Sequence, residues 1–233
     1  IGLQPINSVV DITNYVLHEL GHPLHAFDAD MISGKTVLVK TLPEGTKFTT
    51  LDEVERKLSG KDLMICDEKG GLCIAGVFGG IESGVTTETK NVFLEAAWFN
   101  PSRVRKTAKR HALNTDASFR YERGVDNEMT LFALKRAAQL IAELTGGKLL
   151  GPINHEVTKL PETNEIEITL KRINDLCGAA ISESELETIF DSLDFDYRKS
   201  GENYELKVPS YRVDVTREAD VVEEVLRIYG YNS

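Results

Sequence analysis

The sequence predicts an α+β protein with two domains, a mixed-sheet domain followed by a small winged-helix-like α+β domain. Two observations support this fold class. In the longer N-terminal part, short β-rich runs separated by turn residues lie between segments with helical periodicity. A polar stretch with prolines at residues 151–165 then leads into a strand, two helices, a two-stranded wing and a last helix. We therefore expect domains at residues 1–158 and 159–233.

The first domain is expected to begin with an amphipathic helix over residues 9–20, capped at Asn7 or Ser8 and ended by Gly21 and Pro23. Asn100 before Pro101 marks a second helix start, and Asp126 opens a longer helix that closes at Gly146. Residues 113–123 are then a loop between these two helices. Strands are predicted at residues 36–40, 47–51, 63–66, 72–78 and 92–96.

The second domain is predicted from a regular order of short elements. Residues 182–196 carry six acids and no base, which disfavours DNA binding by that helix. The expected elements are a strand at 166–170, helices at 171–177 and 182–193, a wing of strands at 195–199 and 204–208, and a last helix from Thr216.

Composition excludes several classes of protein. The chain has 233 residues, of which 41% are hydrophobic, enough for one large or two modest cores. The longest apolar stretch, 72–81, is interrupted by glycines and too short to span a bilayer, so we expect no membrane association. Three cysteines without metal-ligand spacing argue against a disulfide framework and favour a cytoplasmic location. We expect a piece of a longer protein, because helical sequence begins almost at once without a signal region.

The net charge of −10 argues against wholesale electrostatic binding of nucleic acid, but the cations are unevenly spread. Residues 103–123 hold seven Lys or Arg against two acids, which we name the basic stripe. On pattern alone a solvated helix face is favoured. The alternative is contact with tRNA phosphates, for which Arg105 and Lys109 are the candidates. The seven cations are Arg103, Arg105, Lys106, Lys109, Arg110, Arg120 and Arg123.

A zinc-protease motif lies at the end of the first helix. His18 and His22 stand four apart with Glu19 between them, the spacing that places two zinc ligands and a general base on one helix. Gly21 weakens the last turn and Pro23 prevents the helix from continuing, so His22 falls at a frayed end. A zinc metalloprotease is therefore kept only as an alternative function.

Five stretches, taken in order, resemble a known family. They are residues 9–16 (VVDITNYV), 25–28 (HAFD), 76–80 (GVFGG), 114–124 (NTDASFRYERG) and 221–232 (VVEEVLRIYGYN). Together they resemble the β subunit of bacterial phenylalanyl-tRNA synthetase over nearly the whole chain. The resemblance implies an editing domain followed by the small winged-helix-like domain, with hydrolysis of mischarged tyrosyl-tRNA(Phe) as the activity. A purely structural or tRNA-binding module is the competing class.

The resemblance also implies the residues of the editing site. Glu95 is the acceptor for the tyrosine phenol and His25 a second polar contact, while Gly79 lets the backbone approach the amino acid. Thr115 binds substrate or positions water, Ala117 leaves room for the ring, and Asn14 lies on the first helix at a further site position. From the residues alone, an edge-strand charge at Glu95 and a structural histidine at His25 are the favoured interpretations. No Ser-His-Asp or Cys-His arrangement can be placed, so we expect no covalent intermediate.

Partners and cofactors follow from the same resemblance. The family assembles as a heterotetramer of two α and two β subunits and acts on tRNA(Phe), with ATP used only by the whole enzyme. The ligase centre lies on the α subunit, so this chain is not expected to aminoacylate alone. A cluster of carboxylates near the end of the chain is expected to share Mg²⁺ with the α subunit, binding it weakly here. Its members are Asp214, Asp220, Glu223 and Glu224.

Overall fold

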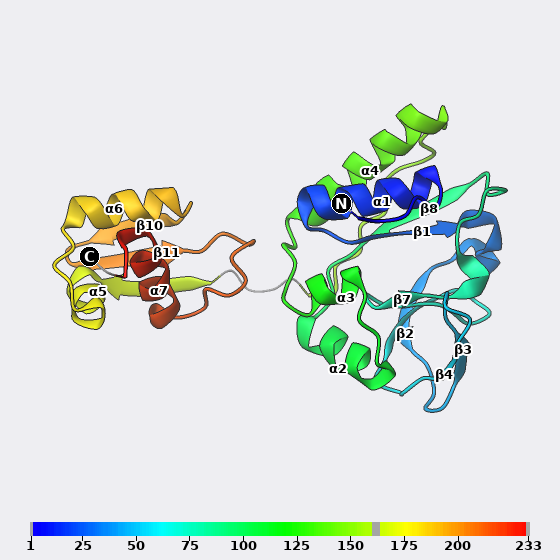
Figure 1. Cartoon of the computed structure of the whole chain (residues 1–233), viewed down its shortest axis with the longest axis horizontal. Helices are drawn as coiled ribbons and strands as arrows, with labels where there is room; N and C mark the ends of the chain where they lie inside the picture. Colours follow the sequence, from blue (N-terminus) through cyan, green and yellow to red (C-terminus); the bar gives the residue numbers. More distant parts are fainter. Residues whose placement is uncertain (1, 160–163, 232–233) are drawn as a thin grey trace. The chain divides into compact units, whose positions relative to one another are not determined.

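The computed structural model describes residues 2–159 and 164–231 (Figure 1). By its contacts the chain forms two compact units, Ile1–His155 and Glu156–Ser233. The boundary we expected after residue 158 stays a prediction. Each unit has a hydrophobic core of its own. No helix in the described ranges is long and apolar enough to cross a membrane.

In the first unit, two helices cover one face of a strand pair (Figure 1). Helix α1 (Ser8–Leu20) begins where the Asn7 side chain accepts hydrogen bonds from two backbone amides, and it ends at Gly21 in the left-handed region with φ of 70°. Helix α4 (Met129–Thr145) ends in the same way at Gly146. Both pack on strands β1 (Leu24–Asp28) and β8 (Val92–Ala96), which pair antiparallel.

The other strands of this unit form separate antiparallel sheets. Strands β2 (Leu38–Thr41), β5 (Leu63–Cys66), β6 (Gly71–Ile74) and β7 (Phe78–Gly79) make a sheet in the order β2-β5-β6-β7. Strand β3 (Lys47–Thr49) pairs with β4 (Glu55–Lys57). Three short 3₁₀ turns lie at Ala29–Met31, Ser33–Lys35 and Ile81–Ser83. The α+β class is confirmed, with several small antiparallel sheets in place of one mixed sheet.

The run at residues 72–78, expected as one strand, is divided into β6 and β7. Gly76 divides it, because its φ of +69° turns the chain where an L side chain is strained. A Cβ there would also lie 2.9 Å from Cδ2 of Phe99. Strands β1 and β4 were not predicted, and β2 begins at Leu38 instead of residue 36.

Two further helices follow β8. Helix α2 (Pro101–His111) starts as expected, with the Asn100 side chain accepting from the backbone amide of Arg103. The expected loop at 113–123 was wrong, because helix α3 (Asp116–Tyr121) lies within it. Thr115 and Ser118 form a reciprocal capping box at its start. Six residues are too few for a hydrophobic period to show in the sequence.

The second unit confirms the predicted order of elements. Strands β9 (Glu165–Thr169), β10 (Asp196–Ser200) and β11 (Asn203–Lys207) form an antiparallel sheet in the order β10-β11-β9. Helices α5 (Leu170–Cys177), α6 (Glu183–Ser192) and α7 (Glu218–Tyr229) pack against it. Its buried core is rich in isoleucine and valine, with Phe190 and Tyr204 fully enclosed.

A buried carboxylate joins the start of β5 to helix α2. Asp62 has no exposed surface. It accepts hydrogen bonds from the Ser59 amide at 2.8 Å, the Thr107 hydroxyl at 2.9 Å and Nε2 of His111 at 2.7 Å, and it pairs with Arg110. Burial alone raises the pKa of Asp62, but these donors outweigh it and hold the pKa below its usual value.

We expect Asp62→Ala to lower the free energy of unfolding of the first unit by about 3–5 kcal/mol, because the buried Thr107 hydroxyl and His111 ring lose their acceptor and the partly exposed Arg110 loses its ion pair. Denaturant unfolding measures this change. Glu88→Ala is the matched control, since Glu88 is exposed and its carboxylate has no hydrogen bond in the described part of the chain. A loss as small for Asp62→Ala as for the control would contradict the role of this cluster.

Candidate functional site

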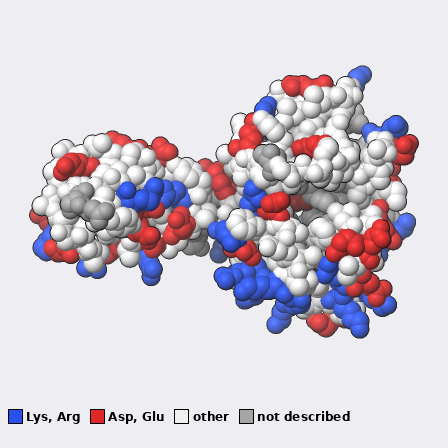
Figure 2. All heavy atoms as spheres, in the orientation of Figure 1, with Lys and Arg blue, Asp and Glu red and all other residues white. Residues whose placement is uncertain are grey.

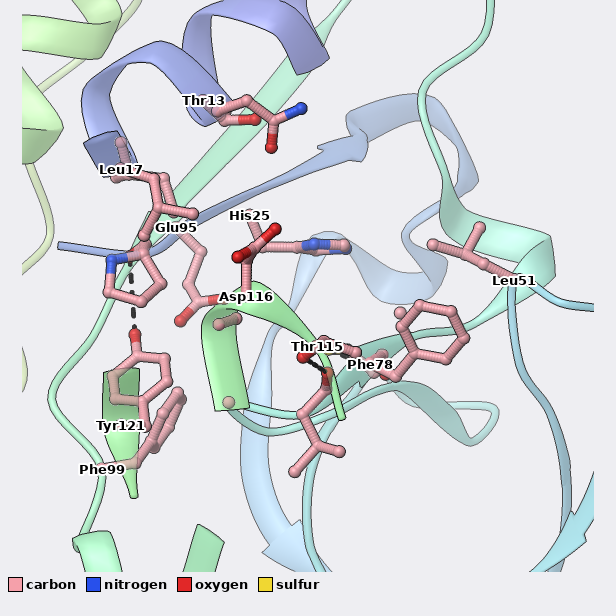
Figure 3. Close-up of a pocket in the computed structure, with 18 residues that line it drawn as sticks. Thr13, Leu17, His25, Leu51, Phe78, Glu95, Phe99, Thr115, Asp116 and Tyr121 are labelled. Carbon is pink, nitrogen blue, oxygen red and sulfur yellow. Dashed lines mark hydrogen bonds between the residues drawn. The ribbon is translucent and has the colours of Figure 1, made fainter. Parts of the chain in front are cut away.

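The first unit contains a cavity of about 240 Å³ between α1, the β1–β8 pair, the β6–β7 turn and α3 (Figure 3). Figure 2 shows the hollow in the visible face of this unit. All six residues that the resemblance suggested for the editing site line this cavity, although five different elements of the chain supply them. They are Asn14, His25, Gly79, Glu95, Thr115 and Ala117. Their roles stay a prediction, but their convergence is a property of the fold.

The register of β1 and β8 places His25 directly opposite Glu95. Opposite residues of an antiparallel pair project from the same face with their Cβ atoms about 5 Å apart. Figure 3 shows both side chains entering the pocket. His25 Nε2 is buried without a hydrogen-bond partner, and no described residue bonds to the Glu95 carboxylate. The pocket therefore has unused hydrogen-bonding capacity at its floor.

Burial sets the charge of these two groups. It raises the pKa of the Glu95 carboxyl from 4.5 to about 7 and lowers the pKa of the His25 imidazole from 6.5 to about 4. At neutral pH His25 is therefore an uncharged ring. Glu95 is then divided between its acid and carboxylate forms, so it can donate or accept a hydrogen bond.

Cys73 also lines the pocket, but it is a poor nucleophile. Burial raises the pKa of its thiol, and the nearby charge of Glu95 raises it further. Its Sγ donates to the carbonyls of Ile74 and Phe78, each at 3.4 Å. The thiol thus stays protonated, which agrees with the expectation that no covalent intermediate forms.

Two of the six residues shape the pocket through the backbone. The Thr115 hydroxyl donates to the Val77 carbonyl at 2.8 Å and accepts from the Ser118 amide at 3.1 Å, so its proton is already used to fix α3 against the β6–β7 turn. At Gly79, a Cβ would lie 2.9 Å from Cε1 of His25 and 2.9 Å from Cδ1 of Leu51. Any side chain there would press on the His25 ring.

Two of the pocket residues that were not foreseen from the sequence lie on α3. Asp116 opens α3 and lines the cavity, with 58% of its side chain exposed. Tyr121 ends the same helix and closes the far side, where its hydroxyl donates to the Ala97 carbonyl at 2.8 Å and its ring meets that of Phe99 edge-on. Recognising a helix at 116–121 would have placed both on one element, but that helix left no periodic signal.

The zinc interpretation of His18, Glu19 and His22 was wrong, because the two histidines do not share a helix. Helix α1 ends at Leu20, and His22 is completely buried beyond it. Burial lowers the pKa of His22 to about 4. Exposed His18 instead lies with Nδ1 3.4 Å from an Arg120 nitrogen, and Glu19 pairs with Arg136 at 3.0 Å. Among the described residues no three His, Cys, Asp or Glu side chains are grouped to hold a metal ion.

The acids suggested for Mg²⁺ lie at the end of the second unit, and three of them already have cationic partners, with Asp214 3.9 Å from Arg212. Asp220 caps the start of α7 by accepting from two backbone amides, and it pairs with Arg217 at 3.2 Å. Glu224 is buried between Arg212 and Arg227. These neutralised carboxylates do not fit a Mg²⁺ site built from the described residues alone. A magnesium site shared with another subunit stays a prediction for Asp214, Asp220, Glu223 and Glu224.

The basic stripe lies mainly on α2, which packs against α3. Figure 2 shows Lys and Arg gathered over the part of this unit where Figure 1 places α2. Three of its cations are engaged: Arg110 with Asp62, Arg120 with Asp116, and Arg123 with Glu122. The other four are exposed and make no ion pair with any described residue; they are Arg103, Arg105, Lys106 and Lys109.

Residues 1–146 match the family model of the B3/4 domain, and residues 166–231 match that of the tRNA synthetase B5 domain. The chain therefore belongs to the B3/4 domain family. Over its whole length it is also similar to phenylalanine-tRNA ligase β subunits, which confirms the resemblance found in the sequence.

Three relatives give the extent of this similarity. The β subunit of Bacteroides thetaiotaomicron is 52% identical over 234 residues, and that of Porphyromonas gingivalis is 53% identical over 234 residues; each match covers 100% of this chain and 28% of the relative. The Protochlamydia amoebophila β subunit is 47% identical, with 99% of this chain and 29% of the relative covered. The chain thus spans less than a third of the length of these relatives. A crystal structure of an N-terminal fragment of the β subunit from Pyrococcus horikoshii aligns with 96% of this chain and 65% of its own, at a TM-score of 0.46 and 21% identity.

We expect Glu95→Gln to stabilise the first unit at high pH but not at low pH. The folded-state pKa of Glu95 lies above its usual value, so its ionisation destabilises the fold progressively as the pH rises from 4.5 through about 7. The amide cannot ionise, and the difference between the proteins should reach at most roughly 3 kcal/mol above pH 7 and vanish below pH 4.5. Denaturant unfolding between pH 4 and 8.5, with Glu88→Gln as control, measures it. If the difference in free energy of unfolding did not depend on pH, the pKa of Glu95 would not be raised by burial.

Proposed function

We propose that the pocket hydrolyses tyrosyl-tRNA(Phe), and that this chain is the editing part of a phenylalanine-tRNA ligase β subunit. The observation that carries the proposal is the pair His25 and Glu95, two hydrogen-bonding groups without partners at the floor of a pocket with apolar and aromatic walls. The full-length similarity to β subunits supports the choice of substrate.

The pair explains how the pocket distinguishes tyrosine from phenylalanine. A synthetic site with apolar walls rejects an added hydroxyl poorly, so some tyrosine is attached in error. In this pocket the tyrosine phenol fills the hydrogen-bonding capacity of Glu95, whereas phenylalanine leaves it unfilled at a cost of about 1–3 kcal/mol for each buried group. The pocket is therefore expected to bind the tyrosyl ester more tightly than the phenylalanyl ester.

Ester hydrolysis needs only water and a polarised carbonyl. The water oxygen adds to the ester carbon and gives up a proton, the tetrahedral intermediate expels the terminal ribose oxygen, which takes up a proton, and the products are tyrosine and uncharged tRNA. Since burial and the nearby charge of Glu95 keep the Cys73 thiol protonated, the nucleophile is water. The ribose hydroxyl of the substrate orients this water, and backbone amides meet the developing negative charge.

The remaining parts of the proposal concern the whole enzyme. The relatives are named β subunits of a ligase, so the partner is an α subunit, in a heterotetramer that charges tRNA(Phe) with ATP and Mg²⁺. Aminoacylation is assigned to the assembled enzyme, with the ligase centre on the α subunit. The second unit, which matches the B5 domain, has a structural or tRNA-binding role.

Glu95→Ala in the full enzyme should leave phenylalanine charging intact while tyrosyl-tRNA(Phe) accumulates, because only the bond to the phenol is lost. Ala117→Trp should have the same effect by filling the slot beside α3. We expect clearance of tyrosyl-tRNA(Phe) to slow by at least about tenfold, on the scale of one charged hydrogen bond. Deacylation of purified tyrosyl-tRNA(Phe) measures the rate, with Glu88→Ala as control.

Normal clearance by both variants would refute the site. Retention of tRNA binding with no deacylation by the unaltered enzyme would favour the alternative, a structural or tRNA-binding module.

The basic stripe should guide the acceptor end of the tRNA through its phosphates. Charge reversal at Arg105 and Lys109 should slow deacylation at low salt, with an effect that shrinks as salt increases. The matched control reverses Lys57 and Lys90, which are exposed and lie outside α2 and α3. Equal rates for the two double variants at low salt would show that the stripe is only a solvated helix face.

A further inference from the structure

The charges that line the pocket are all of one sign. Among the eighteen lining residues the acids are Glu95 and Asp116, and there is no Lys or Arg. The one histidine, His25, is uncharged at neutral pH because burial lowers its pKa to about 4. Such a lining attracts a ligand that carries a positive charge and repels one that carries a carboxylate.

Asp116 is held at the pocket by the start of α3. The capping box of Thr115 and Ser118 fixes this first turn, and the Thr115 hydroxyl ties it to the Val77 carbonyl. Figure 3 shows the Asp116 carboxylate on the side of α3 that faces His25 and Glu95. Its only side-chain partner among the described residues is Arg120, whose Nη1 lies 3.4 Å from Oδ1, and Oδ2 makes no hydrogen bond.

We propose that Asp116 binds the α-ammonium group of the aminoacyl ester, so that the pocket takes esters of tyrosine in preference to free tyrosine. This inference rests on the proposed editing function and adds to it a positioning residue. An aminoacyl ester carries the ammonium group but no carboxylate, which matches an acidic lining without cations. Free tyrosine carries both, and its carboxylate finds no positive partner in the lining.

The same arrangement favours release of the product. Hydrolysis turns the neutral ester into a carboxylate beside Asp116, and the two like charges repel one another. Tyrosine formed in the pocket therefore leaves it, and the large pool of free tyrosine in solution competes poorly with the ester. The phenol is bound through Glu95 and the ammonium group through Asp116, which orients the ester carbonyl between them.

A structural account of Asp116 makes a different prediction. A carboxylate in the first turn of a helix is favourable by itself, and so is its spacing to Arg120. If stabilising α3 were its only role, loss of the charge would affect every substrate alike. Two substrates that differ only in the ammonium group separate these accounts.

The experiment uses the full-length subunit assembled with its partner subunit. Deacylation is measured with tyrosyl-tRNA(Phe) and with the same tRNA esterified to the hydroxy acid analogue of tyrosine, in which a hydroxyl replaces the ammonium group. Asp116→Asn should raise KM for the tyrosyl ester roughly fivefold to tenfold, the scale of a partly exposed charged hydrogen bond, and leave the analogue unchanged. Asp116→Glu should recover part of the loss. Glu122→Gln, at the C-terminal cap of the same helix but outside the pocket lining, should change neither rate.

Competition gives a second readout. Tyrosinamide, which has the ammonium group and no carboxylate, should inhibit deacylation better than tyrosine or N-acetyltyrosinamide, and Asp116→Asn should abolish this preference. An equal loss on both esters, or no loss on either, would overturn the role of Asp116 while editing itself stands. If the unaltered enzyme hydrolyses neither ester, the proposed editing function is refuted, and so is this inference, which rests on it.

Discussion

The pocket depends on the antiparallel register of β1 and β8. Along this pair, Leu24 and Leu94 face the helices α1 and α4, whereas Phe27 and Phe93 face the main core on the opposite side. His25 and Glu95 form the next pair on the Phe27 side. A shift of one residue would move the aromatic pair onto the helices and the polar pair out of the pocket. The apolar residues therefore fix the positions of the polar ones.

This arrangement also explains why two polar groups line the pocket without hydrogen-bond partners. The His25 ring packs edge-on against Phe27 at 4.4 Å, and Gly79 leaves room for it on its other side. Burial of unpaired groups costs free energy, and the pKa of Glu95 near 7 reflects that cost. Other interactions in the fold offset this cost, for example the hydrogen bonds and ion pair of Asp62. Polar groups left unpaired in a cavity are typical of a site completed by a ligand.

Features with a local cause were predictable from the sequence. Asn7 with Gly21, and Asn100 with Pro101, mark helix ends by hydrogen bonds and backbone angles within a few residues, and both predictions are confirmed. Helix α3 was missed because six residues are too few to show a helical period, and strand β1 (LHAFD) was missed because it has no β-branched residue. No local pattern joins His25 to Glu95, since the strand pairing that unites them spans most of the first unit. Only the family resemblance suggested that grouping. The place of Asp116 in the pocket lining became evident only from helix α3 in the structure.

Helix stability alone does not explain the basic stripe. Lys109 and Arg110 lie in the last turn of α2, where the helix dipole favours positive charge, and Arg110 is also bound to Asp62. Arg103 lies in the first turn, which contains no acid and where a cation is unfavourable by about 0.3–1 kcal/mol. Arg105 and Lys106 add to the like-charge repulsion along the same helix. Cations at positions that their own helix disfavours, on a chain of net charge −10, fit the proposed contact with an anionic partner. A partner that reaches the pocket past α2 and α3 would supply this contact, because its phosphates neutralise the charges that the helix leaves unpaired.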